Sequence, residues 1–271
     1  MREQLHTLMD RLRLRGMEAC LDNLLSDSLR LGLAIEDVLV QLLEAEYHYK
    51  NTRAMESRIK HAKIPWKDWS IDTFPFKQKP EINRPQIMSL AKLEFINRFE
   101  NIIFIGEPGV GKSGLAISLL RLALVNGYRG RFYGAQDLLN DLYTSLADRT
   151  TSSLLKTIAA YDILVIDELG YLTLTTEQIN IFFKLIDMRY SKKSTIITTN
   201  LDYHDWYDVF KNKSLVDAML DRFKHYCTTI RIGGDSLRGA GIDSKSKSTK
   251  KQKQADEDQI ISETRITGEV L

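Results

Sequence analysis

A glycine-rich octapeptide, Gly-Glu-Pro-Gly-Val-Gly-Lys-Ser, occupies residues 106–113. An apolar run typical of a strand precedes it at 101–105, and a helical pattern follows at 112–126. Glycines at this spacing let successive backbone amides turn toward one point, where they and the N-terminus of the following helix bind phosphates. The octapeptide therefore predicts a phosphate-binding loop between a strand and a helix, and with it a nucleoside triphosphate site.

The two side chains that end the loop, Lys112 and Ser113, each have a chemical role in binding a nucleotide. Lys112 neutralises the outer phosphates, and the hydroxyl of Ser113 ligates Mg²⁺. A chance glycine turn would not need either residue. The residues expected to bind the nucleotide are Gly106, Glu107, Pro108, Gly109, Val110, Gly111, Lys112, Ser113 and Gly114.

A second motif is the apolar run Ile163–Ile166, which ends in Asp167 and Glu168. Such a run predicts a buried strand that delivers carboxylates to the sheet edge beside the phosphate loop. Asp167 suits a role in holding the magnesium ion through water, and Glu168 suits polarisation of the attacking water. An apolar strand that ends in an acid is common by itself, but the adjacent Glu168 distinguishes the pattern from most small-molecule kinases.

A third motif is the β-branched run at 194–199, which ends in Asn200. The Asn200 amide could hydrogen-bond both a γ-phosphate and the lytic water, as a γ-phosphate sensor must; the alternative is an ordinary turn residue at a strand end. The Asn-Lys-x-Asp sequence with which a GTPase recognises guanine is not found at this position.

From residue 101 onward, strand-like runs alternate with helical patterns. We expect strands at 101–105, 131–135, 162–167, 194–199 and 227–232, with helices between them. This alternation predicts an α/β domain with a parallel five-stranded sheet between helices. Ligands of such sheets bind at the carboxyl ends of the strands.

The expected domains are a helical N-terminal domain at 1–66, a linker and lead-in helix at 67–100, the α/β domain at 101–240 and a disordered, Lys-rich tail at 241–271. In the N-terminal domain, apolar residues at helical spacing predict a core that packs mostly on itself, with helix breaks at Gly16 and near Gly32.

The stretch from residue 63 to residue 85, which leads into and includes the start of the linker, carries four of the five prolines, interleaved with aromatic residues. A free linker would seldom contain so many aromatic side chains. They either wall the adenine of the nucleotide or pack against the sheet. The residues are Trp66, Trp69, Phe74 and Phe76.

Composition limits the class of protein. Hydrophobic residues make up 43% and charged residues 27% of 271, which is ordinary for a globular protein. We find no signal peptide and no membrane segment, and Cys20 and Cys227 have no companion ligands, so we expect a cytoplasmic protein. A formal net charge of +2 does not by itself indicate nucleic-acid binding.

In order, these motifs together with Asp221-Arg222-Phe223 and Ser236-Leu237-Arg238 resemble the AAA+ ATPases of the initiator and helicase-loader branch, and most of all the IstB transposition helpers of insertion sequences. The N-terminal segments Leu14-Arg15-Gly16-Met17 and Ile71-Asp72-Thr73-Phe74 carry the same resemblance.

The resemblance implies an ATPase that uses ATP and Mg²⁺ and assembles into a homo-oligomer, with each site completed by a neighbour. It assigns Arg222 as the arginine finger and Arg238 as a second sensor, although Ser-Leu-Arg departs from the expected Ser-Tyr-Arg. For either arginine the alternative is a surface salt bridge. A replicative helicase loader and a DNA scaffold with little turnover share the same motifs.

The resemblance also implies binding of duplex DNA through backbone contacts and contact with a transposase. Basic pairs on loops could supply phosphate contacts, and solvated charge is the alternative for each pair. The pairs are Lys77 and Lys79, Arg129 and Arg131, Lys192 and Lys193, and Lys211 and Lys213.

Overall fold

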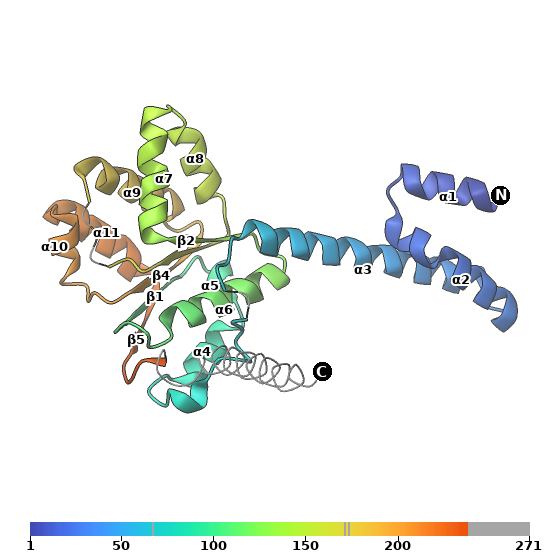
Figure 1. Ribbon diagram of the computed structural model, residues 1–271, viewed down its shortest axis with the longest axis horizontal. Coiled ribbons are helices and arrows are strands. Elements are labelled where there is room, and N and C mark those ends of the chain that lie inside the picture. Colours follow the sequence, from blue (N-terminus) through green and yellow to red (C-terminus); the bar gives the residue numbers. More distant parts are fainter. Residues whose placement is uncertain (67, 171, 173, 238–271) are drawn as a thin grey trace, which may run out of the picture.

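The computed structural model of the protein describes residues 1–66, 68–170, 172 and 174–237 (Figure 1). The strands are β1 (Asn101–Gly106), β2 (Gly130–Gly134), β3 (Ile163–Asp167), β4 (Ser194–Thr199) and β5 (Cys227–Ile232). The helices are α1 (Arg2–Arg11), α2 (Arg15–Leu31), α3 (Ile35–His61), the short 3-10 helix η1 (Phe76–Gln78), α4 (Arg84–Leu90), α5 (Glu94–Asn97), α6 (Lys112–Val125), α7 (Ala135–Ala147), α8 (Thr151–Ala159), α9 (Thr176–Arg189), α10 (Trp206–Phe210) and α11 (Lys213–His225).

The five strands form one parallel sheet, as the alternating pattern predicts, and the structure shows their order to be β2-β3-β4-β1-β5. Successive side chains of a strand point to opposite faces. Ile102 and Phe104 of β1 therefore enter one core, and Ile103 and Ile105 enter the other. Because both of its faces are buried, the inner part of the sheet has near-continuous apolar runs in β1 and β3, which do not alternate with polar residues.

Helices cover both faces of the sheet (Figure 1). On one face, α6 packs with α4, α5 and the linker around the core that contains Leu115 and Phe104. On the other face, α7 to α11 pack around the core that contains Leu164 and Phe182. The result is a three-layer α/β/α domain.

The strand order decides where the functional loops lie. Strand β4 pairs with β1 on one side and with β3 on the other. The loops that leave the carboxyl ends of β1, β3 and β4 are therefore neighbours at one sheet edge. These loops begin the phosphate loop, the Asp167-Glu168 motif and Asn200 respectively, so three motifs that are far apart in sequence meet there.

The first three helices form a separate unit, which extends from the α/β domain (Figure 1). Glu46 of α3 accepts hydrogen bonds from the amides of Gly16 (2.7 Å) and Met17 (3.1 Å), and so caps the start of α2. A Cβ atom on Gly16 would lie 2.5 Å from the carbonyl oxygen of Ala45, which explains the glycine.

The predicted helix break at Gly16 is therefore wrong, because Gly16 belongs to the first turn of α2 and is required there by close packing on α3. The break between α1 and α2 lies instead at Arg13, where φ is 57°. The break near Gly32 is confirmed, since Gly32 ends α2 with φ 65°.

Helix α3 joins this unit to the α/β domain. Its last turn packs on α6, where the Arg58 guanidinium donates to the Leu124 carbonyl (2.9 Å). The Phe132 amide on edge strand β2 donates to the carbonyl of Ala62 (2.8 Å), and Ala62 is fully buried. The end of the N-terminal unit is thus part of the sheet domain's own packing.

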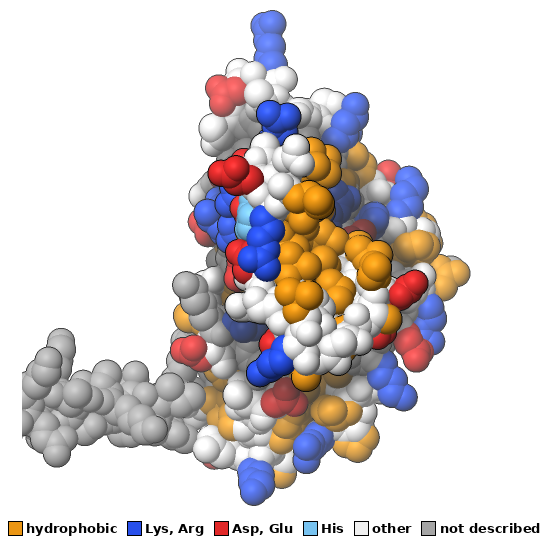
Figure 2. All heavy atoms as spheres, turned by 90° about the vertical axis from the view of Figure 1, so that its right-hand side faces the viewer, with side chains coloured by type: hydrophobic (Ala, Val, Ile, Leu, Met, Phe, Trp, Pro, Cys, Tyr) orange, Lys and Arg blue, Asp and Glu red, His pale blue; other side chains and the backbone are white. Residues whose placement is uncertain are grey.

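The prediction that the apolar stripes of the N-terminal helices pack mostly on themselves holds for only part of these residues. A small core does form, in which half-buried apolar side chains pack on three buried ones; the half-buried residues are Leu14, Met17, Cys20, Leu24, Leu25 and Val38. Only Met9, Leu21 and Leu42 are buried among the described apolar residues of this core. Figure 2, which looks onto these helices, shows apolar side chains gathered on one face. The exposed ones are Leu5, Leu8, Leu12, Leu29, Leu31, Ile35, Leu39, Val40, Leu43 and Tyr47.

Two smaller outcomes concern the rest of the chain. The single helix expected before the sheet is divided into α4 and α5 by Leu93, whose φ is 62°. The expected tail at 241–271 lies outside the described residues. Within the described part of the chain, no helix has the length and apolar character needed to cross a membrane.

Candidate functional site

The phosphate loop lies between β1 and α6, as its sequence predicts. Its turn depends on glycine at two points, since Gly109 has φ 85° and Gly111 has φ 103°. The loop also passes close to its surroundings. A Cβ atom on Gly106 would lie 2.1 Å from the carbonyl oxygen of Ile232 on the neighbouring strand β5.

Lys112 begins α6 and lies back along the loop. Its Nζ donates hydrogen bonds to the carbonyl oxygens of Gly106 (2.7 Å) and Glu107 (2.8 Å), and the residue is 8% exposed. These carbonyls hold the ammonium group over the concave side of the loop. The first amides of α6 have no acceptor within a helix, so amides and ammonium together offer positive charge to an anion at the same point.

Asp167 ends β3 and is buried beside Ser113. Burial raises the pKa of the Asp167 carboxyl above its usual range, and hydrogen bonds from Thr198 and Ser113 oppose that rise. The Thr198 hydroxyl donates to Oδ1 of Asp167 at 2.5 Å. A buried carboxylate and a hydroxyl in contact are oxygen ligands of the kind that Mg²⁺ takes beside a nucleotide. The donor set at this point fits the ion.

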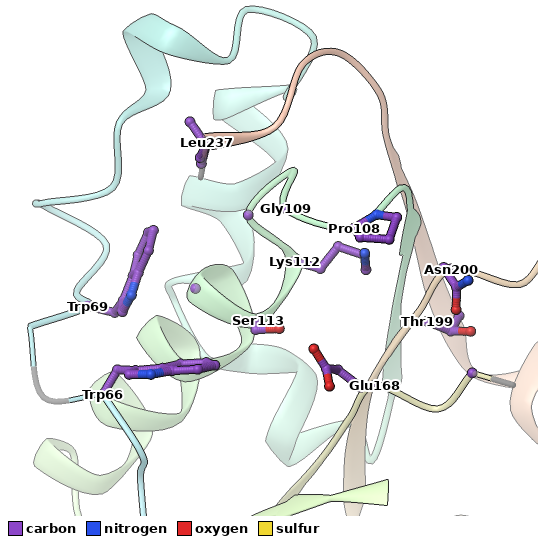
Figure 3. Close-up of a pocket in the computed structure, with 13 residues that line it drawn as sticks. Trp66, Trp69, Pro108, Gly109, Lys112, Ser113, Glu168, Thr199, Asn200 and Leu237 are labelled. Carbon is purple, nitrogen blue, oxygen red and sulfur yellow. The ribbon is translucent and has the colours of Figure 1, made fainter. Parts of the chain in front are cut away.

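Glu168 is the next residue, and its exposed side chain enters the same pocket as Ser113 (Figure 3). Its backbone is in the left-handed region, with φ 59°. This conformation costs energy for a residue other than glycine. It is supported by β4, since the Glu168 amide donates to Oγ1 of Thr198 (2.9 Å) and the Leu169 amide donates to the Thr198 carbonyl (2.9 Å).

Asn200 follows β4 and also lines the pocket. Its Oδ1 lies so close to Gly170 that a Cβ atom there would approach it to 2.7 Å. The preceding Thr199 donates to the Leu169 carbonyl and accepts from the Leu201 amide (3.0 Å). The loops after β3 and β4 are therefore fixed to each other, which places Glu168 and Asn200 at one cavity.

The cavity has a volume of about 550 Å³, within the range of small-molecule sites. Residues from the linker, the phosphate loop, the β3 and β4 loops and the C-terminal end of the described chain surround it (Figure 3). The lining residues are Trp66, Trp69, Pro108, Gly109, Gly111, Lys112, Ser113, Gly114, Glu168, Gly170, Thr199, Asn200 and Leu237.

The structure divides the four linker aromatics between the two alternatives. Trp66 and Trp69 line the cavity, and Trp69 lies so close to Gly114 that a Cβ atom would approach its ring to 2.6 Å. Phe74 is buried under Gly111 and packs on Phe76, with ring centroids 4.8 Å apart.

Comparison with known proteins matches residues 7–247 to the family described as IstB-like ATP binding protein. The chain belongs to this family. It is 36% identical over 236 residues to an ATP-binding protein named for insertion sequence IS232 of Bacillus thuringiensis subsp. berliner, covering 87% of this chain and 94% of that one. It is 34% identical over 235 residues to the corresponding IS21 protein of Pseudomonas aeruginosa, covering 87% and 88%.

Among solved structures, the DnaC helicase loader matches with a TM-score of 0.51 at 25% identity, covering 61% of this chain and 97% of that one. The replication initiator DnaA bound to AMPPCP and single-stranded DNA matches with a TM-score of 0.53 at 17% identity, covering 63% and 51%. The α/β domain of this IstB-like protein thus has the AAA+ P-loop fold, as the resemblance implies.

Of the two arginines to which the resemblance assigns a role, Arg222 lies within the described residues and Arg238 does not. Arg222 lies on α11 and is not among the residues that line the cavity of its own chain. It forms a salt bridge with Asp187 of α9 at 2.9 Å. Arg238 lies outside the described residues.

Four of the basic residues considered for DNA contact are engaged within this IstB-like chain. Lys79 is 2% exposed and donates to the carbonyl of Asp235, so it cannot reach a phosphate. Lys193 is paired with Asp162 at 2.5 Å, and Arg131 donates to the carbonyl of His61 (2.6 Å). Arg129 is exposed, but its Nη2 donates to the carbonyl of Ala160 (3.1 Å). The exposed residues that remain as candidates are Lys77, Lys192, Lys211 and Lys213.

The sequence interpretation missed two contributors to the site. Thr198 was seen only as a β-branched strand residue, yet it bonds Asp167 and supports Glu168; a threonine one residue before the end of a motif strand was the available signal. Leu237 closes the cavity through the hydrogen bond of its amide to the Gly109 carbonyl (2.9 Å), and no local pattern indicates this long-range contact.

Proposed function

We propose that this IstB-like protein is a Mg²⁺-dependent ATPase that assembles on duplex DNA and assists a transposase. The observation that carries the proposal is that Lys112, Ser113, Glu168 and Asn200 line one cavity, while Asp167 is buried next to it and hydrogen-bonded to Ser113. A protein that only bound nucleotide would need the phosphate loop, but it would not need an exposed carboxylate and an amide on the opposite wall.

The proposed roles follow from position. Lys112 and the loop amides bind the outer phosphates, and Ser113 with Asp167 would hold Mg²⁺. When bound, the ion would neutralise charge that develops on the phosphoryl group. Glu168 accepts a proton from the attacking water, and Asn200 orients that water against the γ-phosphate.

Glu168→Gln tests hydrolysis directly, because glutamine keeps the size of the side chain and removes the base. We expect ATP binding to persist while turnover falls by about 10²-fold or more. Lys112→Ala is the matched variant that should lose binding itself. Equal turnover in Glu168→Gln and wild type would contradict the proposal and favour the scaffold with little turnover.

The transposase is the partner that the relatives support, since they are named for insertion sequences. The family match also includes the N-terminal helices. Apolar side chains gather on one exposed face of these helices (Figure 2), and a face of this kind is typical of protein contact. We assign it to the transposase.

Helicase loading is the second candidate function, favoured by the match to 97% of the DnaC chain. That match covers 61% of this chain, whereas the insertion-sequence relatives cover 87%. Binding assays with purified transposase and purified replicative helicase separate the two functions. Retention of the helicase alone would reverse the choice.

DNA binding is proposed to use the phosphate backbone through exposed Lys192, Lys211 and Lys213. Backbone contacts release counterions, so affinity should fall linearly with the logarithm of salt concentration. Titrations of one duplex at several salt concentrations measure that slope, and a second duplex of scrambled sequence should give the same affinity. A slope of zero would rule out backbone binding.

A further inference from the structure

Arg222 is held by contacts on three sides. Its Nε donates to Oδ1 of Asp187 at 2.9 Å, and its Nη1 donates to the carbonyl of Ala218 at 2.8 Å. The guanidinium lies over the Phe183 ring, 4.8 Å from the centroid. Asp187 and Phe183 both belong to α9, so this helix fixes a side chain of α11.

The contacts leave one part of the guanidinium available. An arginine has five N–H donors in a planar fork, and within the described residues Nη2 of Arg222 donates to none. The side chain is 27% exposed. The Nε and Nη1 sides thus face the protein's own chain, while Nη2 can meet an anion that arrives from outside.

We propose that Asp187 is a positioning residue, which holds Arg222 of one subunit in the orientation needed at the nucleotide of the neighbouring subunit. The proposal rests on the ATPase function proposed above and on the neighbour-completed site that the family resemblance implies. In this view the salt bridge between Asp187 and Arg222 orients the Arg222 guanidinium for catalysis, in addition to joining α9 and α11.

The physical reason is the cost of ordering a long side chain. An unrestrained arginine samples many rotamers, and fixing them when the neighbour binds would oppose the interaction. Asp187, the Ala218 carbonyl and the Phe183 ring fix the side chain beforehand. A displacement of about 1 Å at a catalytic group can lower a rate by about 10²-fold, so loss of one of these contacts should be visible in turnover.

Asp187→Ala is the first test, and its side chain is 53% exposed, so the fold should tolerate the change. We expect turnover at saturating ATP to fall by about tenfold, with KM for ATP unchanged. Asp187→Asn keeps an oxygen acceptor for Nε and should retain most of the activity. Glu177→Ala, an exposed carboxylate at the other end of α9, is the control.

Mixed oligomers give the decisive measurement. A Glu168→Gln subunit keeps Arg222 but cannot hydrolyse ATP at its own site. An Arg222→Ala subunit keeps its own catalytic residues but has no arginine to give to its neighbour. Each alone should be inactive, and their mixture should recover ATP hydrolysis at sites where the first donates its finger to the second. Asp187→Ala is then placed in one partner at a time.

The expected result is that Asp187→Ala lowers the recovered rate by about tenfold when it is added to the Glu168→Gln donor and has no effect in the Arg222→Ala acceptor. Equal recovery in both arrangements would overturn the positioning role, and equal loss in both would reduce Asp187 to a structural residue. Absence of recovery in the parent mixture would refute the shared site itself, and the role of Asp187 with it.

Discussion

Thr198 of β4 donates a hydrogen bond of 2.5 Å to Asp167 of β3, and the same hydroxyl accepts a hydrogen bond from the amide of Glu168 at 2.9 Å. One side chain therefore orients the proposed magnesium ligand and supports the left-handed backbone of the proposed base. The hydroxyl couples the geometry of two functional carboxylates that the sequence motif provides side by side.

Thr198→Val keeps the shape of the side chain and removes both hydrogen bonds. We expect turnover to fall by about tenfold or more, because Asp167 and Glu168 lose their common support. The part-buried amide of Glu168 would also lose its partner, at a cost of about 1 kcal/mol in unfolding free energy. Steady-state kinetics and denaturant unfolding measure the two effects.

Thr228→Val is the matched control for Thr198→Val. Thr228 is a half-buried strand threonine on β5 and does not line the cavity. Its replacement should leave turnover unchanged. If Thr198→Val were as active as this control, Thr198 would have no part in positioning the two carboxylates.

Trp66 should contribute to nucleotide affinity only through contact with the adenine base. It is 46% exposed and lines the cavity beside Trp69. If adenine stacks on it, Trp66→Ala should weaken ATP binding by about 1 kcal/mol, or about fivefold in Kd. Inorganic tripolyphosphate, which has no base, should bind both proteins equally, as measured by titration calorimetry.

The control for the stacking prediction is Phe99→Ala, which removes an exposed aromatic side chain that does not line the cavity. It should bind ATP as wild type does. If Trp66→Ala weakened the binding of tripolyphosphate as much as the binding of ATP, Trp66 would instead support the conformation of the phosphate loop.

The sheet and its three motif loops were predictable because each depends on local pattern. An apolar run followed by Asp167 or Asn200 specifies a buried strand and a polar edge, and parallel strands bring their carboxyl ends together. The support from Thr198 was not predictable, since it depends on β4 lying between β1 and β3. A list of strands does not fix their order.

The N-terminal helices show a different limit of the sequence. Their apolar spacing correctly predicted helices, but it could not say whether Leu39 and Leu43 face a core or solvent, because periodicity identifies a face and not what covers it. The prediction of a DNA contact at Lys79 was wrong for a similar reason. Its charge indicated exposure, whereas the fold buries it against the Asp235 carbonyl.

The apolar face of α3 gives the next prediction. Leu39 and Leu43 are 52% and 59% exposed and one helical turn apart. Leu39→Glu with Leu43→Glu should abolish binding of the purified transposase, while unfolding free energy changes by no more than about 1 kcal/mol, as usual for surface positions. ATP affinity should not change. If only self-association were lost, a second copy of the chain would be the occupant of this face.

Glu46 should make the N-terminal unit sensitive to acid. Burial by itself raises the pKa of Glu46, but hydrogen bonds from the amides of Met17 and Gly16 and from Lys50 outweigh it, so the pKa lies below the ordinary value of 4.5. A carboxyl whose pKa is lower in the folded state stabilises that state above its unfolded pKa. This stabilisation is lost as pH falls from 4.5 through the lowered value.

Glu46→Gln isolates that contribution, because glutamine is always neutral and has a similar size. At pH 7 the variant should be less stable by about 1–2 kcal/mol, since the charged acceptor of two α2 amides is lost. The difference from wild type should shrink as pH falls below 4.5, where wild-type Glu46 also takes up a proton. Urea unfolding followed by far-ultraviolet circular dichroism measures it, with exposed Glu44→Gln as control. A stability difference that stays constant down to acid pH would show that shape, and not charge, makes Glu46 necessary.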